Sequence, residues 1–416
     1  MTGILQKDRD ILRRLGEKIY SIANHPSMAE TRKSWTLMNG LRSRRPMVMV
    51  ETSGILDEIL PLDTMECTHP WAKQQERSLR DKILHFEFIR DDWPVEPRIT
   101  YGHTIRKTGY GVDVVRHTGV SEYGKGSFTW DPQVTDIDEG LEKLRFREYT
   151  IDRETSARHI ESLHAVFDGI LPIEHRGWYM WTQGLTINLV DLIGMEGLLY
   201  AFYDQPEALH RIMAFMRDEQ LNTLKWHEDA GLLFPNNQDD YVGSGGFGYT
   251  DELPKEGHTE GSPATARDMW GLSESQETVN ISPAMFDEFI FPYQLPVISR
   301  FGLVCYGCCE PVEKRWHSIR TIPNLRRISV SPWSDQATMA ENLGKSYVFS
   351  RKPNPAMIST QGWDEELMAK DIQETLFHAK GLHVEFIMKD VHTILHDAGR
   401  LRRWVEIVRE QVEKFG

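Results

Sequence analysis

The second half of the chain alternates short apolar runs with longer amphipathic segments. Each apolar run has the length of a buried strand, and each amphipathic segment repeats its apolar residues at helical spacing. This alternation favours a parallel sheet with right-handed crossover helices. The predicted strands are Gly302–Tyr306, Arg326–Val330, Ser346–Ser350 and Leu382–Met388, and the predicted helices are Pro311–Ile319, Asp335–Leu343, Asp364–Ala379 and Ala398–Phe415.

The first half contains fewer clear elements. The N-terminal segment Met1–Tyr20 has the pattern of an amphipathic helix and lacks the apolar region of a signal peptide. Met47–Val50 predicts the first strand, and the aromatic-rich run Gly177–Thr186 predicts another buried strand. Asp204 and Ser282 are residue types that cap helices, and an amphipathic segment follows each of them.

Two segments depart from this alternation. Ile99–Val134 contains short alternating runs interrupted by glycine, which predicts an antiparallel hairpin insertion. Asn236–Thr278 is rich in glycine, proline, serine and threonine, and a connection of this length is usually functional. We expect it to form a lid over the site. Its glycine-rich part, Gly243–Thr250, lacks the lysine of a phosphate-binding loop.

A polar cluster follows each of the four late strands. In a (β/α)₈ barrel the active site is built at the carboxyl ends of the strands, so this placement favours that architecture. We therefore predict an α/β protein with one elaborated (β/α)₈ TIM barrel over residues 1–416, a hairpin insertion at 99–134 and a lid loop at 236–278. The polar clusters are Cys308–Glu310, Ser331–Asp335, Arg351–Asn354 and Lys389–His392.

The composition of the chain argues against some classes of binding partner. The chain has 48 basic and 62 acidic residues, a net charge of −14, which argues against nucleic acid as a ligand. No apolar run is long enough to span a membrane. Cys305, Cys308 and Cys309 are clustered, whereas a secreted disulfide framework spreads its cysteines along the chain. We expect a cytoplasmic protein with no nucleic-acid or membrane partner.

The segment Ser282–Tyr293 (SPAMFDEFIFPY), followed by a strand that ends in cysteines, resembles the uroporphyrinogen decarboxylase superfamily. Three further segments, Gly177–Glu196, Asp204–Glu207 and Tyr347–Ala356, resemble that superfamily in the same order. The superfamily includes corrinoid-dependent methyltransferases. The resemblance implies a TIM barrel, and for the methyltransferase branch a zinc site after the sixth strand and a corrinoid carried by a partner protein.

The chain departs from both branches at particular residues. The decarboxylases have an arginine-rich loop after the first strand, whereas Arg42, Arg44 and Arg45 precede it here, which disfavours porphyrinogen decarboxylation. The methyltransferases have a His-x-Cys at the strand end where this chain has Tyr306-Gly307-Cys308. Their cysteine ligand after the last strand is also missing, because Lys389–His392 occupies that place.

The candidate metal ligands are Cys308, Glu310 and His392. Residues two apart on a strand share a face, so Tyr306, Cys308 and Glu310 are expected to point together. Thiolate, carboxylate and imidazole ligands suit Zn²⁺, and His392 would complete the site from the last strand. Cys309 or Asp390 could replace one of these ligands. The alternative is that the cysteines are simply small buried side chains.

Other residues are candidates for proton transfer and substrate binding. Asp390 would orient the histidine ligand or handle a proton, and the resemblance places a polar substrate contact near Glu277. Tyr306 and Arg351 would contact substrate, Arg351 by clamping a carboxylate or phenolate. Trp270 would suit an aromatic substrate. The alternatives are an ion pair for Arg351 and a solvated loop carboxylate for Glu277.

These observations lead to one main hypothesis. The chain is predicted to be a zinc-dependent methyltransferase that moves a methyl group from a small methylated substrate to the cobalt of a separate corrinoid protein. An aryl methyl ether is one such substrate, and the reaction would then be O-demethylation. The alternatives are a metal-free decarboxylase or lyase on the same scaffold, and a non-catalytic barrel that binds a small molecule.

Overall fold

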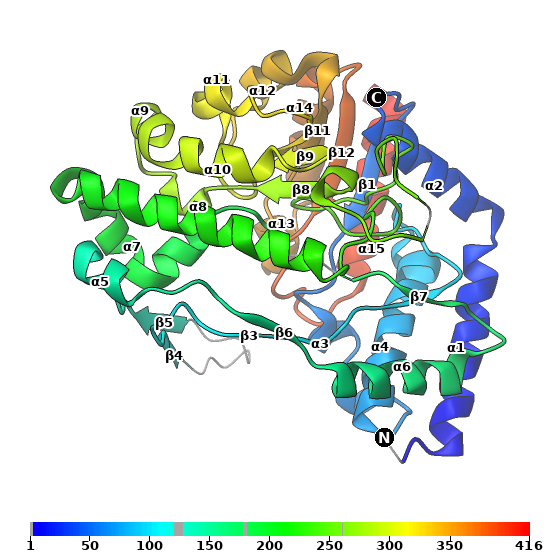
Figure 1. Cartoon of the computed structure of the whole chain (residues 1–416). Coiled ribbons are helices and arrows are strands. Elements are labelled where there is room, and N and C mark those ends of the chain that lie inside the picture. The colour runs from blue at the N-terminus through cyan, green and yellow to red at the C-terminus, as the bar shows by residue number, and fades with distance from the viewer. Residues whose placement is uncertain (1–2, 120–127, 178–180, 260) are drawn as a thin grey trace.

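The computed structural model describes residues 3–119, 128–177, 181–259 and 261–416. In Figure 1 strands β8, β9, β11, β12 and β1 lie side by side near the centre, and helices from both halves of the chain surround them. The N-terminus and the C-terminus lie at opposite ends of this view. None of the helices in the described ranges is long and apolar enough to cross a membrane.

Six parallel strands form the central sheet, in the order β1-β12-β11-β10-β9-β8. Every neighbouring pair in this order is parallel, so the fold belongs to the α/β class. The six strands are β1 (Met47–Val50), β8 (Trp270–Ser273), β9 (Leu303–Tyr306), β10 (Leu325–Val330), β11 (Val348–Arg351) and β12 (His383–Met388).

A second parallel pair consists of β2 (Ile99–Tyr101) and β7 (Ile173–His175). In the described part of the chain, each parallel strand is hydrogen-bonded to the next parallel strand in the sequence, except between β1 and β2 and between β7 and β8. Beyond β7, the backbone N–H of Gln183 donates to the carbonyl of Leu272 in β8 at 2.6 Å. The two sheets are therefore joined at this point by the segment that follows β7.

Most of the strands predicted from the apolar runs are confirmed. β1 has the predicted bounds, and β9 to β12 lie within two residues of theirs. The strand predicted at Gly177–Thr186 is wrong, because β7 ends at His175 and a helix begins at Thr186. β7 is short and only partly buried, so it has no apolar run to mark it. Residues 178–180 of the predicted strand lie outside the described residues.

The helices that follow the late strands are also confirmed in position. The predicted helix Pro311–Ile319 is shorter in the structure, with one turn at Glu313–Arg315 followed by α11 (Trp316–Ile319).

Of the two predicted helix N-caps, Ser282 is confirmed, because its side chain accepts a hydrogen bond from the Met285 N–H. Asp204 is not a cap, because it is the last residue of α7 and Pro206 starts the next helix. The long helices are α1 (Gln6–Ala23), α2 (Pro26–Asn39), α4 (Pro70–Leu84), α6 (Arg153–Phe167), α7 (Thr186–Asp204), α8 (Pro206–Asp229), α14 (Glu365–His378) and α15 (Gly399–Phe415).

Shorter elements complete the fold. The antiparallel pairs are β3 with β6 and β4 with β5, and residues 120–127 between β4 and β5 lie outside the described residues. These strands are β3 (Ile105–Lys107), β4 (Val115–Thr118), β5 (Phe128–Asp131) and β6 (Tyr149–Ile151), and the short helices are α3 (Leu56–Ile59), α5 (Ile137–Lys143), α9 (Pro283–Met285), α10 (Phe291–Ile298), α11 (Trp316–Ile319), α12 (Gln336–Leu343) and α13 (Ala356–Ser359).

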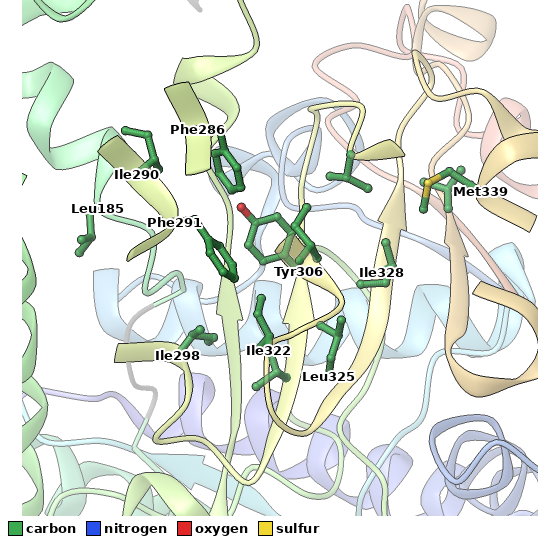
Figure 2. Close-up of a cluster of buried hydrophobic side chains, with 14 of the residues drawn as sticks. Leu185, Phe286, Ile290, Phe291, Ile298, Tyr306, Ile322, Leu325, Ile328 and Met339 are labelled. Carbon is green, nitrogen blue, oxygen red and sulfur yellow. The ribbon is translucent and has the colours of Figure 1, made fainter. Parts of the chain in front are cut away.

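The two faces of the central sheet have different partners. One face packs against helices, and Figure 2 shows Tyr306 of β9 on this face beside Phe286 and Phe291. The other face, with Met49 and Cys305 among its side chains, packs against a loop of the chain itself. The alternation of side chains along each strand therefore decides whether a residue meets the helices or the loop.

That loop, residues 241–250, is called the inner loop below. Its residues 242–250 are buried, and the carbonyls of Phe247 and Tyr249 accept hydrogen bonds from Asn39 at 2.8 Å. The inner loop belongs to the segment expected to form a lid, but it lies against the inner face of the sheet. The chain passes from α8 to the amino end of β8. This connection therefore enters the interior from the end where the parallel strands begin.

Glycine allows this close approach. Gly243 has φ +68° and Gly245 has φ +122°, a region that favours glycine. A Cβ at Gly243 would lie 2.8 Å from the Cys305 Sγ, and one at Gly245 would lie 2.6 Å from the Cγ2 of Ile387. The glycine-rich sequence is therefore explained by packing inside the sheet.

We expect Gly243→Ala to destabilise the protein more than Gly257→Ala. Both positions have positive φ, so both substitutions cost about 1–2 kcal/mol of backbone strain. Only Gly243 has neighbours in the way of a Cβ, since Gly257 has none within 4 Å. Overpacking should add roughly 1–3 kcal/mol at Gly243. Urea unfolding measures the difference, and equal losses for the two variants would contradict this packing.

Candidate functional site

The carboxyl ends of β9 and β12 meet at a pair of charged contacts. The Sγ of Cys308, after β9, lies 3.7 Å from the Nζ of Lys389, after β12. The Cys309 Sγ lies 3.7 Å from the Cys308 Sγ and 3.6 Å from the Oδ2 of Asp390, and its one proton can be donated to either. β9 and β12 are separated in the sheet by β10 and β11. The sheet is therefore curved strongly enough for its strand ends to face one another.

The backbone around Cys308 is held in place by Glu310. β9 ends at Tyr306, and Gly307 turns the chain with φ +89°. The fully buried Glu310 carboxylate accepts from the Cys308 N–H at 2.9 Å and from the Ser275 N–H at 3.0 Å. These bonds tie the end of β9 to the end of β8 and fix where the Cys308 side chain points.

The neighbours of Cys308 favour its thiolate. The hydrogen bond from Cys309 and the nearby Lys389 ammonium lower the pKa of Cys308, although burial opposes them. The same hydrogen bond, together with burial, raises the pKa of Cys309. Burial disfavours the charged form of Lys389, but the Cys308 and Asp390 charges outweigh it and raise the pKa of Lys389. Cys308 thus lies between a second thiol and an ammonium group, a setting that favours the thiolate of a reactive cysteine.

The inner loop also reaches this site. The Tyr241 hydroxyl donates to the Oε2 of Glu51, which follows β1, at 2.7 Å. Burial and the Glu51 carboxylate raise the pKa of Tyr241 well above its ordinary value. The Lys389 Nζ lies 5.9 Å from the centre of the Trp181 ring. An aromatic and carboxylate wall therefore surrounds the thiolate and the ammonium group.

A second ammonium group lies beneath them. Lys352 is buried and donates to Ser350, which in turn donates to Glu385. Arg327 Nε lies 3.2 Å from the same Glu385 carboxylate. Burial lowers the pKa of Lys352 to about 8, so a sizeable fraction of this amine is neutral near physiological pH.

A buried carboxyl group completes the site. Glu274 follows β8 directly and is fully buried, with its oxygens accepting from Thr182 at 3.3 Å and from the Gln276 N–H at 3.1 Å. Burial first, and then the charges of Glu277 and Glu310, raise the pKa of Glu274 well above its ordinary value. The raised pKa favours the neutral form of Glu274, which can give up a proton.

A cavity of about 220 Å³ lies where β7 and β8 are not hydrogen-bonded. Trp181 and Tyr241, which border the thiolate site, both line it. Trp270, the predicted aromatic substrate contact, lines it too. Arg176 also lines this cavity and forms an ion pair with Asp240 at 2.5 Å.

Two of the predicted substrate contacts face the wrong side of the sheet. Tyr306 is in the helix-facing core, where its hydroxyl lies 3.1 Å from the Ser275 Oγ (Figure 2). Arg351 forms an ion pair with Asp371 of α14 at 2.6 Å and also faces the helices. Because side chains alternate along β11, the next residue, Lys352, points inward in its place.

The predicted zinc ligands are not brought together. Within the described ranges, no three histidine, cysteine, aspartate or glutamate side chains are grouped so that they could hold a metal ion. Both oxygens of Glu310 are engaged by backbone N–H groups, and His392 is exposed whereas Glu310 is fully buried. The expectation that Tyr306, Cys308 and Glu310 share a face is wrong because β9 ends at Tyr306. These residues do not fit a zinc ion held by Cys308, Glu310 and His392.

The predicted catalytic carboxylates lie in different places. Asp390 is beside Cys309 and Lys389, within the site. Glu277 accepts a hydrogen bond from the Thr186 hydroxyl at the start of α7 at 2.7 Å. Sequence reasoning missed Glu51, Glu274 and Lys352. Glu51 and Glu274 directly follow strands, so the strand-end rule would have found Glu274 had β8 been recognised.

Comparisons with known proteins give limited information. No protein-family profile matches the chain. No curated protein sequence is similar to it at a significant level. Among solved structures, a methyltransferase from Methanosarcina mazei is similar, with 12% sequence identity, 90% of this chain and 97% of that chain covered, and a TM-score of 0.48. No functional conclusion follows from a likeness at this level.

We expect Lys389→Met to slow alkylation of Cys308 near neutral pH. Loss of the ammonium group raises the pKa of Cys308, and one pKa unit lowers the thiolate fraction by about tenfold. The rate with iodoacetamide, followed by peptide mapping as a function of pH, measures this change. The wild-type and variant rates should converge at high pH, where both thiols are ionised. A parallel shift at every pH would instead indicate altered access.

Proposed function

We propose that this chain is a methyltransferase built on an incompletely closed (β/α)₈ barrel, with the Cys308 thiolate at its reacting centre. The donor is a small methylated molecule, and the acceptor is the cobalt of a separate corrinoid protein. The observation that carries the proposal is the Cys308–Lys389 contact at the carboxyl ends of β9 and β12. Eight parallel strands in sequential order, with chemistry at their carboxyl ends, support the barrel.

In the first step, the thiolate attacks the methyl carbon of the donor. A bond forms between Cys308 Sγ and the methyl carbon, and the bond from that carbon to the donor heteroatom breaks. The heteroatom keeps the electron pair and takes a proton, and Glu274, whose pKa is raised, is the proposed source of that proton. The cavity lined by Trp181 and Trp270 is where the donor is proposed to bind.

In the second step, the methyl group passes from Cys308 to the acceptor cobalt, and the thiolate is released. The features that lower the pKa of Cys308 also make its thiolate a better leaving group, because they stabilise the same negative charge. Lys389 and the Cys309 thiol supply this stabilisation. Since the predicted zinc ligands do not fit a metal ion, no step is assigned to zinc.

A metal-free decarboxylase or lyase is the second candidate. The observation that favours it is the group of cations beneath the site, Lys352, Lys389 and Arg327, which could neutralise a carboxylate substrate. Glu385, Glu51 and Asp390 lie near these cations and offset much of their charge. The methyl-transfer proposal is preferred because it uses the thiolate, for which the decarboxylase has no role.

The direct test is methyl transfer from 2-methoxyphenol to free cob(I)alamin, followed by the absorbance of methylcobalamin. Cys308→Ser should lower the rate by roughly two orders of magnitude or more, because the hydroxyl is not ionised at neutral pH. The matched control is Cys67→Ser, since Cys67 is a buried cysteine outside the site and its loss should leave the rate unchanged. Full activity of Cys308→Ser would overturn the role of the thiolate.

A further inference from the structure

Two consecutive thiols lie side by side at the mouth of the site. The sulfur atoms of Cys308 and Cys309 are 3.7 Å apart. The Cys309 side chain is exposed, and Cys308 is buried behind it. The other two cysteines, Cys67 and Cys305, are buried elsewhere, Cys305 against the inner loop.

This convergence is not the ordinary result of sequence adjacency. Neighbouring residues on a strand point to opposite faces, so adjacent thiols on a strand diverge. Here β9 has ended, Gly307 turns the backbone with positive φ, and Glu310 holds the Cys308 N–H. The Cys309 Sγ lies 3.6 Å from the Oδ2 of Asp390 and 3.7 Å from the Cys308 Sγ, so it contacts both groups on one side of the chain.

We propose that Cys308 and Cys309 are a redox modification site, at which a peroxide converts the two thiols into a disulfide between consecutive residues. The Cys308 sulfur attacks one peroxide oxygen, the O–O bond breaks, and Cys308 becomes a sulfenic acid as one water leaves. The Cys309 sulfur then attacks the Cys308 sulfur, the S–S bond forms, the S–O bond breaks and a second water leaves. The two sulfurs lose two electrons and two protons, and the peroxide is reduced to water.

Such a disulfide is readily reversed. The Cα atoms of consecutive residues are about 3.8 Å apart across a trans peptide, whereas disulfides usually join Cα atoms about 4.4–6.8 Å apart. The bond is therefore strained, and strained disulfides are the easily reduced, regulatory ones. Oxidation removes the thiolate, so the inference rests on the proposed function for its effect on activity. Cys309 also protects Cys308, because it captures the sulfenic acid before further oxidation.

The experiment treats the full-length wild type, Cys309→Ser and Cys67→Ser with hydrogen peroxide at increasing doses. Mass spectrometry of the peptide that contains residues 308 and 309 is the first readout, and methyl transfer before and after dithiothreitol is the second. In the wild type and in Cys67→Ser, we expect this peptide to lose two hydrogens and to regain them with dithiothreitol. In Cys309→Ser, Cys308 should gain two oxygens as sulfinate, and dithiothreitol should not remove them.

The two readouts separate this inference from the proposed function. A disulfide that forms and is reduced while methyl transfer never changes supports the redox pair and overturns the role of Cys308 in transfer. Sulfinate at Cys308 of the wild type, disulfide-linked dimers through Cys309, or unchanged thiols at doses that oxidise Cys308 in the Cys309→Ser variant would each overturn the redox pair.

Discussion

The interior of the protein is organised around a buried guanidinium group. Arg327, in β10, is almost fully buried, and a charge in that position is stable only if its donors are satisfied. It donates to the Asn39 side chain at 2.6 Å and to carbonyls of the inner loop, and it faces the Glu385 carboxylate. Its guanidinium carbon lies 5.3 Å from the centre of the Trp270 ring. One cation therefore fixes α2, the inner loop, β12 and a wall of the cavity in relation to one another.

The site depends on the same arrangement. The inner loop carries Tyr241 to Glu51, and Arg327 stabilises the loop in the interior by donating hydrogen bonds to its carbonyls. Glu385 faces Arg327 and accepts a hydrogen bond from Ser350, and Ser350 accepts one from the Lys352 ammonium group. The Arg327 charge that holds the loop is thus coupled through two side chains, Glu385 and Ser350, to Lys352. Packing and site chemistry share one network of polar contacts.

The parts of the fold that could be predicted from the sequence are those with strong local patterns. β9 to β12 are buried on both faces and appear as apolar runs, and their helices have clear caps and periodicity. β7 and β8 are short and bounded by irregular chain, so no local pattern marks them. The composition of the inner loop predicts a loop, because glycine and serine are typical of loops, but it does not indicate whether that loop is exposed or buried. Its burial depends on partners such as Asn39, far away in the sequence.

The strand-end pattern leads to the neighbourhood of Cys308 and Lys389, but it does not show which side chains there point inward. Cys308 and Asp390 lie where the strand-end rule places them. Arg351 and Tyr306 have the chemistry of substrate contacts, but the register of β11 and β9 turns them toward the helices. Glu310 has the chemistry of a metal ligand, but both of its oxygens accept from backbone N–H groups. A sequence pattern shows which residues lie near the end of a strand. Which of their side chains points into the site depends on the residue at which the strand ends.

The contacts of Arg327 have a consequence for how the chain acquires its structure. Asn39 lies 288 residues before Arg327 in the sequence, and Glu385 lies after Arg327. Contacts this far apart form late, because a long loop must close before they contribute. During synthesis, α1, α2 and β1 leave the ribosome well before β10 and β12, so the inner face of β1 stays uncovered in the meantime. The nascent chain is therefore at greatest risk of aggregation in this interval, and a chaperone that covers apolar strands would be needed most before β12 is made.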